Sequence, residues 1–208
     1  MSSRLIPAVL LTAMLAGGTA LAQNKVRTET IRPPAPGSQT FKNEGHAVDP
    51  SAAAMPEIIT DQARLPPAVA RMRERILAAA RSGDLGRVVA VMKTGTAMPV
   101  FSFSDDSDPI AFWKANYPDS EGVEALSILI NVLETGFVHV DVGTPQEIYL
   151  WPYFARLPLK SLTPAQRVEL FRIVTGADYK EMVEFGVYSF YRLGIAPDGT
   201  WQFFVSGD

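Results

Sequence analysis

The C-terminal stretch from Val187 to Val205 constrains the fold more than any other part of the chain, because it predicts a β-hairpin around a defined turn. Pro197-Asp198-Gly199 fits a three-residue loop, in which a type I turn is followed by a residue in the left-handed region. Proline presets φ at the first turn position, and glycine adopts positive φ without a Cβ clash. A chain with this hairpin needs an antiparallel sheet and a layer that covers it.

The three-residue loop also sets the register that we expect. It gives three opposed pairs: Ile195–Trp201, Leu193–Phe203 and Tyr191–Val205. Directly opposed residues share a face of the sheet, so these residues form one apolar face, which a two-residue Asp-Gly loop would break up. The opposite face is also aromatic, and we expect a second layer of the fold, rather than a ligand, to cover part of it. Its residues are Tyr188, Phe190, Arg192, Gln202 and Phe204.

Two glycines of this hairpin carry different expectations. Gly199 occupies the left-handed turn position, so Gly199→Val is expected to destabilise the fold by at least about 1 kcal/mol. Gly194 lies within a strand and needs no special φ. Gly194→Ala is therefore expected to cost less.

The first 22 residues are typical of a signal peptide. Arg4 provides the positive region, residues 5–15 are almost unbroken apolar sequence, and Ala20-Leu21-Ala22 is a small-x-small cleavage signal. The apolar run is shorter than the ~20 residues that span a bilayer, and no later stretch is apolar for long enough. There is no twin arginine and no cysteine for a lipid. We expect general export, a periplasmic location, and no transmembrane segment after cleavage.

Residues 23–60 are rich in proline, glycine and small side chains, which predicts a disordered linker because such a segment buries too little apolar surface to offset its chain entropy. A single globular domain is then expected over residues 61–208. The chain has no cysteine, so disulfides and thiol chemistry are excluded. Its net charge of −3 is weak and argues against nucleic-acid binding.

Helical periodicity and capping signals recur through this domain. Residues 120–134 are expected to form the most buried helix, because only a narrow polar stripe interrupts their apolar residues. Residues 98–103 are expected to form a short strand. Six helix starts are expected: Pro66, Asp84, Asp108, Ser120, Thr163 and Asp178. Together with two hairpins, these elements predict an α+β fold, with four to six helices packed on a small antiparallel sheet.

The first of these helices is basic. A basic helix can bind anionic lipid or a polyanion. The nearby carboxylates of Glu74 and Asp84 dilute the charge, which favours a solvated surface instead. The arginines concerned are Arg71, Arg73, Arg75 and Arg81.

A second predicted hairpin carries the one group of residues that suggests chemistry. Residues 137–143 and 147–151 each alternate apolar and polar positions, and a three-residue loop, 144–146, would join them. The opposed pairs in this register are Asp141–Tyr149 and His139–Trp151. The resulting polar-aromatic face comprises His139, Asp141, Glu147, Tyr149 and Trp151.

Three interpretations of this face remain open. In an envelope hydrolase, His139 would act as a general base with Asp141 or Glu147. In a binding module, Tyr149 and Trp151 would contact an envelope protein or a glycan. In a purely structural interpretation, the face is the outer side of a half-buried hairpin. His139 is the only histidine of the predicted domain, so any histidine-dependent chemistry needs it.

Motifs for other chemistries do not occur in the sequence. There is no G-x-S-x-G, S-x-x-K, H-E-x-x-H, phosphate loop or G-x-G-x-x-G. The carboxylates of residues 105–108 do not match a calcium loop, because Pro109 and Ala115 stand where glycine and glutamate are needed. One histidine gives a zinc site too few ligands. We therefore expect no metal and no cofactor, and a non-enzymatic binding or interaction module before an enzyme. Nothing in the sequence indicates an oligomeric state.

The predicted domain contains E-I-Y-L-W-P-Y-F-A at residues 147–155, L-T-P-A-Q at residues 162–166, and G-I-A-P-D-G-T-W followed by F-F-V-S-G-D at the C-terminus. In these three segments it resembles a family of exported bacterial proteins that has no assigned activity. The resemblance covers most of residues 76–208. It implies export and a shared domain, and it assigns no functional residues.

Overall fold

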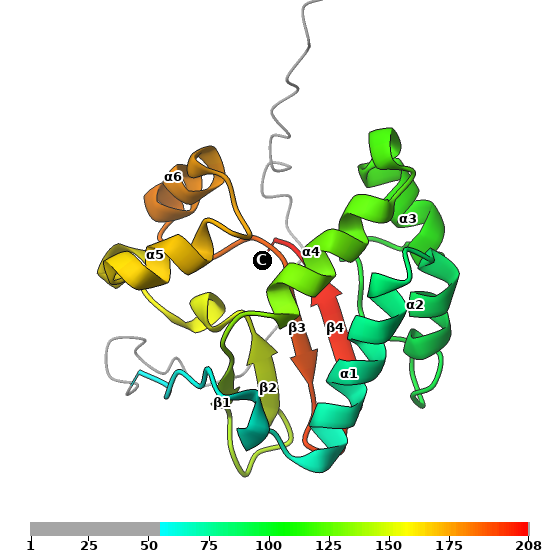
Figure 1. Ribbon diagram of the computed structural model, residues 1–208, viewed down its shortest axis with the longest axis horizontal. Helices are drawn as coiled ribbons and strands as arrows, with labels where there is room; N and C mark the ends of the chain where they lie inside the picture. The colour runs from blue at the N-terminus through cyan, green and yellow to red at the C-terminus, as the bar shows by residue number, and fades with distance from the viewer. Residues whose placement is uncertain (1–54, 208) are drawn as a thin grey trace, which may run out of the picture. The chain divides into compact units, whose positions relative to one another are not determined.

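The computed structural model describes residues 55–207. The expected signal peptide (1–22) and most of the expected linker (23–60) lie outside the described residues. The described part contains six α-helices and one four-stranded antiparallel sheet, which confirms the α+β fold. Their arrangement is drawn in Figure 1. The strands lie in the sheet in chain order, β1-β2-β3-β4. None of the helices in this part of the chain is long and apolar enough to cross a membrane.

The bounds of the elements are as follows. The α-helices are α1 (Pro67–Arg81), α2 (Leu85–Met92), α3 (Pro109–Asn116), α4 (Val123–Leu133), α5 (Pro164–Leu170) and α6 (Gly176–Phe185). The strands are β1 (Val138–Val140), β2 (Ile148–Trp151), β3 (Arg192–Ile195) and β4 (Trp201–Val205). Short 3-10 helices are η1 (Gln62–Arg64), η2 (Pro118–Ser120), η3 (Tyr153–Arg156) and η4 (Leu159–Ser161).

Side-chain caps start several helices where the sequence indicated them. Asp108 accepts a hydrogen bond from a backbone N–H at the start of α3, and Thr163 and Gln166 form the capping box of α5. α6 begins earlier than expected, because Thr175 and Asp178 form a second capping box. Asp178 is therefore the third residue of α6 and not its cap.

The main core lies between one face of the sheet and helices α1, α2 and α4 (Figure 1). Leu129, Val132 and Leu133 of α4 are fully buried in it. The sheet contributes apolar residues from every strand or its immediate flank: Phe137, Tyr149, Trp151, Leu193, Ile195, Trp201 and Phe204. Burying one large apolar side chain stabilises a fold by about 1.5–3 kcal/mol, so this cluster is a dominant source of stability.

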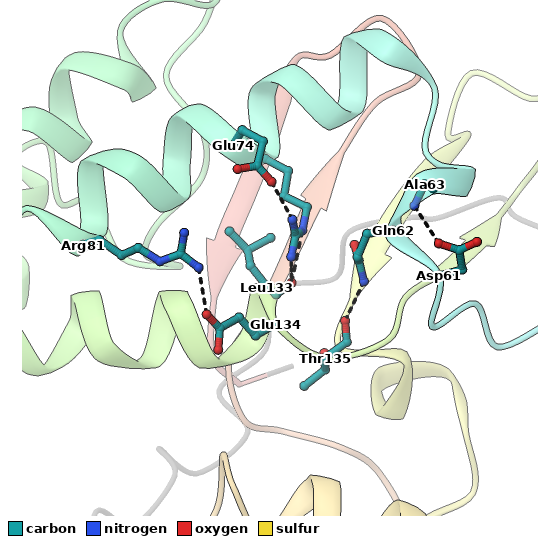
Figure 2. Close-up of polar contacts among 9 residues, drawn as sticks. Asp61, Gln62, Ala63, Glu74, Arg81, Leu133, Glu134 and Thr135 are labelled. Carbon is teal, nitrogen blue, oxygen red and sulfur yellow. Dashed lines mark hydrogen bonds and ion pairs between the residues drawn. The ribbon is translucent and has the colours of Figure 1, made fainter.

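Buried polar contacts also tie α1 to the C-terminal end of α4 (Figure 2). Arg73 is buried, and its Nε and Nη2 donate to the carbonyl oxygen of Leu133 at 3.2 and 2.8 Å. On the same side, Arg81 pairs with Glu134 at 2.9 Å. The last carbonyls of a helix have no partner within the helix, and a cation is favourable there. Arg73 and Arg81 are therefore bound within the fold and are not part of a purely solvated basic surface.

The turn of the β3–β4 hairpin is the three-residue loop that the sequence predicts. The N–H of Ala196 donates to the carbonyl oxygen of Thr200 at 2.9 Å, and the pair closes the loop. Gly199 has φ +89°, in the left-handed region. Ile195 pairs with Trp201, as expected.

Beyond that pair the expected register is wrong. The register shifts between Gly194 and Ile195, because a β-bulge makes Gln202 an extra residue in β4. One inserted residue turns every later side chain to the opposite face. Phe204 therefore lies in the main core, while Phe203 turns to the other face of the sheet. The observed pairs are Gly194–Phe203, Leu193–Phe204 and Arg192–Val205.

The strand expected over residues 98–103 is reduced to one bridge on the edge of β4. Val100 pairs with Phe203 in a parallel bridge. The Val100 N–H donates to the carbonyl oxygen of Gln202 at 2.9 Å, and the Val100 carbonyl accepts from the Phe204 N–H at 2.8 Å. The extra residue of the bulge thus has its carbonyl satisfied by this segment.

A second apolar cluster covers part of the other face of the sheet. It joins Val138 and Leu150 of the sheet to Leu170 of α5 and Met182 of α6. Tyr188 belongs to it, and the partly buried Phe203 packs against it. This layer confirms the expectation that the fold itself covers part of the second aromatic face.

The packed region begins before residue 61, the residue at which the globular domain was expected to start. Ile59 is buried, and its N–H and carbonyl exchange two hydrogen bonds of 2.9 Å with Phe137. Glu57 pairs with Arg64 at 2.6 Å. Gln62 donates to the Thr135 carbonyl oxygen at 3.1 Å (Figure 2). The expected boundary therefore cuts through contacts of the fold.

Candidate functional site

The turn between β1 and β2 starts earlier than expected. β1 ends at Val140, and His139 pairs with Tyr149, so the expected pairs Asp141–Tyr149 and His139–Trp151 are wrong. Asp141 has φ +56°, which takes the chain out of strand geometry. The carbonyl oxygen of Asp141 accepts from the Thr144 N–H at 3.1 Å and from its hydroxyl at 2.7 Å. These local bonds favour a turn that begins at Asp141 and not at Thr144.

The structure brings His139 and Glu147 together across this turn. His139 Nε2 lies 2.8 Å from Glu147 Oε1, and the two side chains are 26% and 25% exposed. The imidazole stacks on the Tyr149 ring, with centroids 4.1 Å apart and an interplanar angle of 8°. Glu147 Oε2 accepts from the Gly143 N–H at 2.8 Å. Both carboxylate oxygens of Glu147 therefore hold the turn.

Glu147 is held in its ionised form beside His139. The Gly143 N–H, and after it the hydrogen bond from His139, hold the pKa of Glu147 below its usual value. An ionised carboxylate at this distance can orient the imidazole and leaves Nδ1 for another partner, as in a catalytic dyad. The same contacts also order the turn, so this pKa shift is common to a structural and a catalytic role.

Asp141 does not complete a catalytic group with His139. Its Oδ2 faces Arg156 Nη2 at 3.5 Å, and both side chains are about half exposed. No hydrogen bond between Asp141 and His139 occurs in the described part of the chain. An exposed ion pair of this kind contributes little to stability, about 0–1 kcal/mol.

Tyr149 and Trp151 are core residues, so the expectation that they form an exposed binding face is wrong. Trp151 is fully buried and packs on Phe137, with ring centroids 5.1 Å apart. Tyr149 is only 7% exposed and lies against the rings of Phe137 and His139. Alternation showed that the two faces of this hairpin differ, but it could not show that the aromatic face turns to the main core.

The opposite face of the sheet carries an open groove of about 940 Å³, which we call the sheet groove. Ile148 and Leu150 of β2 and Phe203 of β4 line its sheet side. Its loop side comes from the β1–β2 turn and from residues 155–158 and 186–188. The bulge that turns Phe203 to this face therefore helps to build the groove.

Gly194 is the residue that lets the sheet side of the groove form. It is buried in β3, where it pairs with Leu150 on one side and Phe203 on the other, and the side chain of Ile148 reaches over it. A Cβ at this position would lie 2.6 Å from Phe203 Cζ and would also collide with the end of Ile148. The missing side chain allows these two apolar residues to pack over the strand.

The charges that line the sheet groove balance one another. Asp141 and Glu147 are acidic, and Arg156 and Arg192 are basic. Arg156 pairs with Asp141, and Arg192 donates from Nη1 to the Gly207 carbonyl. A lining with two acidic and two basic side chains suits a ligand that has both positive and negative charges, or one with polar backbone groups. It does not favour a ligand with a high charge of one sign.

The groups of the described groove lining that could act as nucleophiles are the carboxylates of Asp141 and Glu147. The described lining contains no serine, threonine, cysteine, lysine or histidine. Tyr188 carries the one hydroxyl group in the described lining. This hydroxyl donates to the Tyr191 carbonyl oxygen at 2.9 Å, and burial raises the pKa of the phenol. Across residues 55–207, no three histidine, aspartate or glutamate side chains gather in a way that could hold a metal ion.

Sequence reasoning missed most of this groove. Arg156 and Val187 lie in segments with no clear period, and nothing in the sequence placed them opposite β2. A partial signal existed in Ile148 and Leu150, which form the apolar alternate of residues 147–151. Both residues line the groove, and Leu150 is at the same time buried in the second apolar cluster.

Comparisons of the chain with family models, with curated proteins and with solved structures found no match. The fold and the groove define the class of protein, which is an α+β domain with an open groove, lined by both apolar and charged residues, on one face of its sheet.

Proposed function

We propose that the protein is a non-enzymatic binding module of the cell envelope, and that the sheet groove binds a segment of another envelope protein. The observation that carries this proposal is the groove itself, which is open and partly apolar, and whose two carboxylates, of Asp141 and Glu147, already contact Arg156, Gly143 and His139. Its volume lies within the range of ordinary ligand sites, about 300–1,000 Å³. A binding site needs complementary surface, which the groove offers, and it needs no reactive group.

A protein segment suits this groove better than a glycan. Sugars are recognised largely by stacking on exposed aromatic faces. Of the two aromatic residues in the described lining, Tyr188 is buried and Phe203 is half-buried against the second apolar cluster. The groove instead presents partly exposed aliphatic surface, with Val187 45% exposed at its lining. Apolar side chains of a partner would bury this surface, and its polar groups would meet the charged lining.

The envelope location rests on the sequence. An n-region arginine, an apolar run and the Ala20-Leu21-Ala22 signal support export with cleavage after Ala22. Intact mass of the periplasmic protein tests it, and a mass that includes residues 1–22 would refute it.

The experiment that tests the groove uses peptides selected on the purified protein from a random library, with affinities measured by calorimetry. Val187→Asp is expected to weaken binding about ten-fold or more, because a charge replaces exposed apolar surface in the groove. Val168→Asp is the matched control, because Val168 is 70% exposed on α5 and does not line the groove. Equal effects of the two variants, or no effect of Val187→Asp, would contradict the proposal.

An envelope hydrolase is the second candidate, and the observation that favours it is the hydrogen bond between His139 and Glu147. Glu147 lines the groove, whereas His139 does not. If the protein were a hydrolase of this kind, His139→Gln would abolish turnover of a bound peptide. Recovery of intact peptide from the wild-type protein after long incubation would exclude that activity on it.

A further inference from the structure

A smaller hollow of about 310 Å³ lies between α1, the turn after α2 and the β3–β4 turn. It is separate from the sheet groove and shares no lining residue with it. We call it the arginine hollow. The lining residues that matter here are Arg71 and Arg75 of α1, Thr94 and Gly95 after α2, and Asp198 and Thr200 of the β3–β4 turn.

The two arginines of the hollow differ from the other arginines near them. Arg64, Arg73 and Arg81 each bind a carboxylate or a backbone carbonyl. Within residues 55–207, neither Arg71 nor Arg75 takes part in an ion pair or a hydrogen bond. They lie four residues apart on α1, so their side chains leave the same face of the helix. Two like charges on one face are unfavourable unless an anion joins them.

The walls of the hollow are fixed by close packing. A Cβ on Gly199 would lie 2.9 Å from the Ala68 carbonyl oxygen, so the β3–β4 turn sits directly on the first turn of α1. A Cβ on Gly95 would lie 3.9 Å from the Thr200 methyl group, so the turn after α2 contacts the same hairpin turn. No hydrogen bond of the Gly95 N–H occurs in the described part of the chain, which leaves it available as a donor. The arginines therefore face a preformed rim.

We propose that the arginine hollow binds a phosphate group of a small molecule, held between the guanidinium groups of Arg71 and Arg75. Guanidinium presents paired N–H donors that match phosphate oxygens, and such charge-assisted bonds are stronger than neutral ones. The hollow is at the small end of ligand sites, which fits a headgroup or small ester and not a polymer. Asp198 opposes the anion and leaves the hollow with one net positive charge.

The first test measures binding of glycerol 3-phosphate to the purified protein by calorimetry at constant ionic strength. Arg71→Gln and Arg75→Gln are each expected to weaken binding at least about ten-fold. Arg87→Gln is the matched control, because Arg87 is an exposed arginine of α2 outside the hollow. Since neither Arg71 nor Arg75 has a partner in residues 55–207, thermal unfolding of both variants should match the wild type.

A second variant, Asp198→Asn, is expected to bind glycerol 3-phosphate more tightly than the wild type. Asp198 Oδ1 accepts from the Thr200 N–H at 2.8 Å, and the amide oxygen of asparagine can keep that bond. Asp198→Asn should therefore preserve the turn while it removes the opposing charge, and it should strengthen glycerol 3-phosphate binding about five-fold. Unchanged or weaker binding in this variant would overturn the assignment of the ligand to the hollow.

Vesicles separate the two sources of the phosphate. Binding to phosphatidylglycerol vesicles but not to phosphatidylcholine vesicles, lost in Arg71→Gln, would assign a lipid headgroup. Binding of glycerol 3-phosphate alone would assign a free ester. The proposal is overturned if neither phosphate probe binds, or if Arg87→Gln weakens binding as much as the two hollow variants.

Discussion

Gly194 shows how one residue decides which surface the molecule presents. The sequence suggested a tolerant glycine within a strand, because nothing local demanded its conformation. The structure places Ile148 and Phe203 in the space that a side chain would fill. A contact between residues this far apart in the chain leaves no local trace, so its requirement for glycine could not be predicted.

Gly194→Ala is therefore expected to destabilise the fold by about 1–3 kcal/mol, as overpacking of a buried site does. The earlier expectation that it costs less than Gly199→Val loses its basis. Urea unfolding measures both changes. Gly176→Ala in α6 is the control, because a Cβ there meets no atom within 4 Å and φ is not positive. A Gly194→Ala cost no larger than that of the control would contradict the close packing.

Glu147 is expected to make stability fall in acid. Its pKa is lowered in the folded state from the ordinary 4.5, so its carboxylate stabilises the fold above that pH. This contribution is lost as pH falls through the folded-state pKa. Glu147→Gln should lose less stability than the wild type between pH 7 and about pH 3.

The control for that measurement is Glu181→Gln, because Glu181 is an exposed carboxylate of α6. It should follow the wild-type pH dependence of the urea midpoint. If Glu147→Gln and Glu181→Gln behave alike, the bonds from Gly143 and His139 do not hold the turn in solution.

Features of helices and strands that depend on adjacent residues could be predicted from the sequence, whereas features that depend on contacts between distant residues could not. The turn at residues 197–199 and the capping box of α5 depend on residues adjacent in sequence, and both are confirmed. The bulge at Gln202 depends on Gly194 across the sheet and on Val100 at its edge. The β1–β2 turn begins at Asp141 because side-chain bonds compete there with strand pairing. The alternation of apolar and polar residues predicts neither the position of the bulge nor the start of this turn.

The segment before η1 belongs to the fold as an element. A mature chain shortened to begin at Asp61 is expected to unfold at a clearly lower urea midpoint than one that begins at Met55. The shorter chain lacks Ile59, whose buried side chain and two bonds to Phe137 close the outer edge of β1. Ile59→Ala alone should cost about 2–5 kcal/mol. Equal midpoints for the two chains would show that the segment does not pack.

In the whole molecule, the two faces of the sheet differ in how completely they are covered. One face, with Phe137, Trp151 and Phe204, packs on the helices and holds the fold together. The other face is only partly covered, and the sheet groove lies there. The sequence predicted the class of fold and the existence of two aromatic faces. It could not predict the groove, because the groove is built from five separate segments that meet only in the folded chain.

Mapping of amide chemical shifts shows where on the protein a bound peptide lies, and so tests whether a protein segment binds in the sheet groove. On titration of the isotope-labelled protein with a selected peptide, we expect saturable shifts at residues 146–148 and 186–188, which line the groove. Amides of α1 and α4 on the packed face should stay unchanged. Shifts that cluster on α1 or α4, or no saturable shift at the groove, would show that the peptide does not bind there.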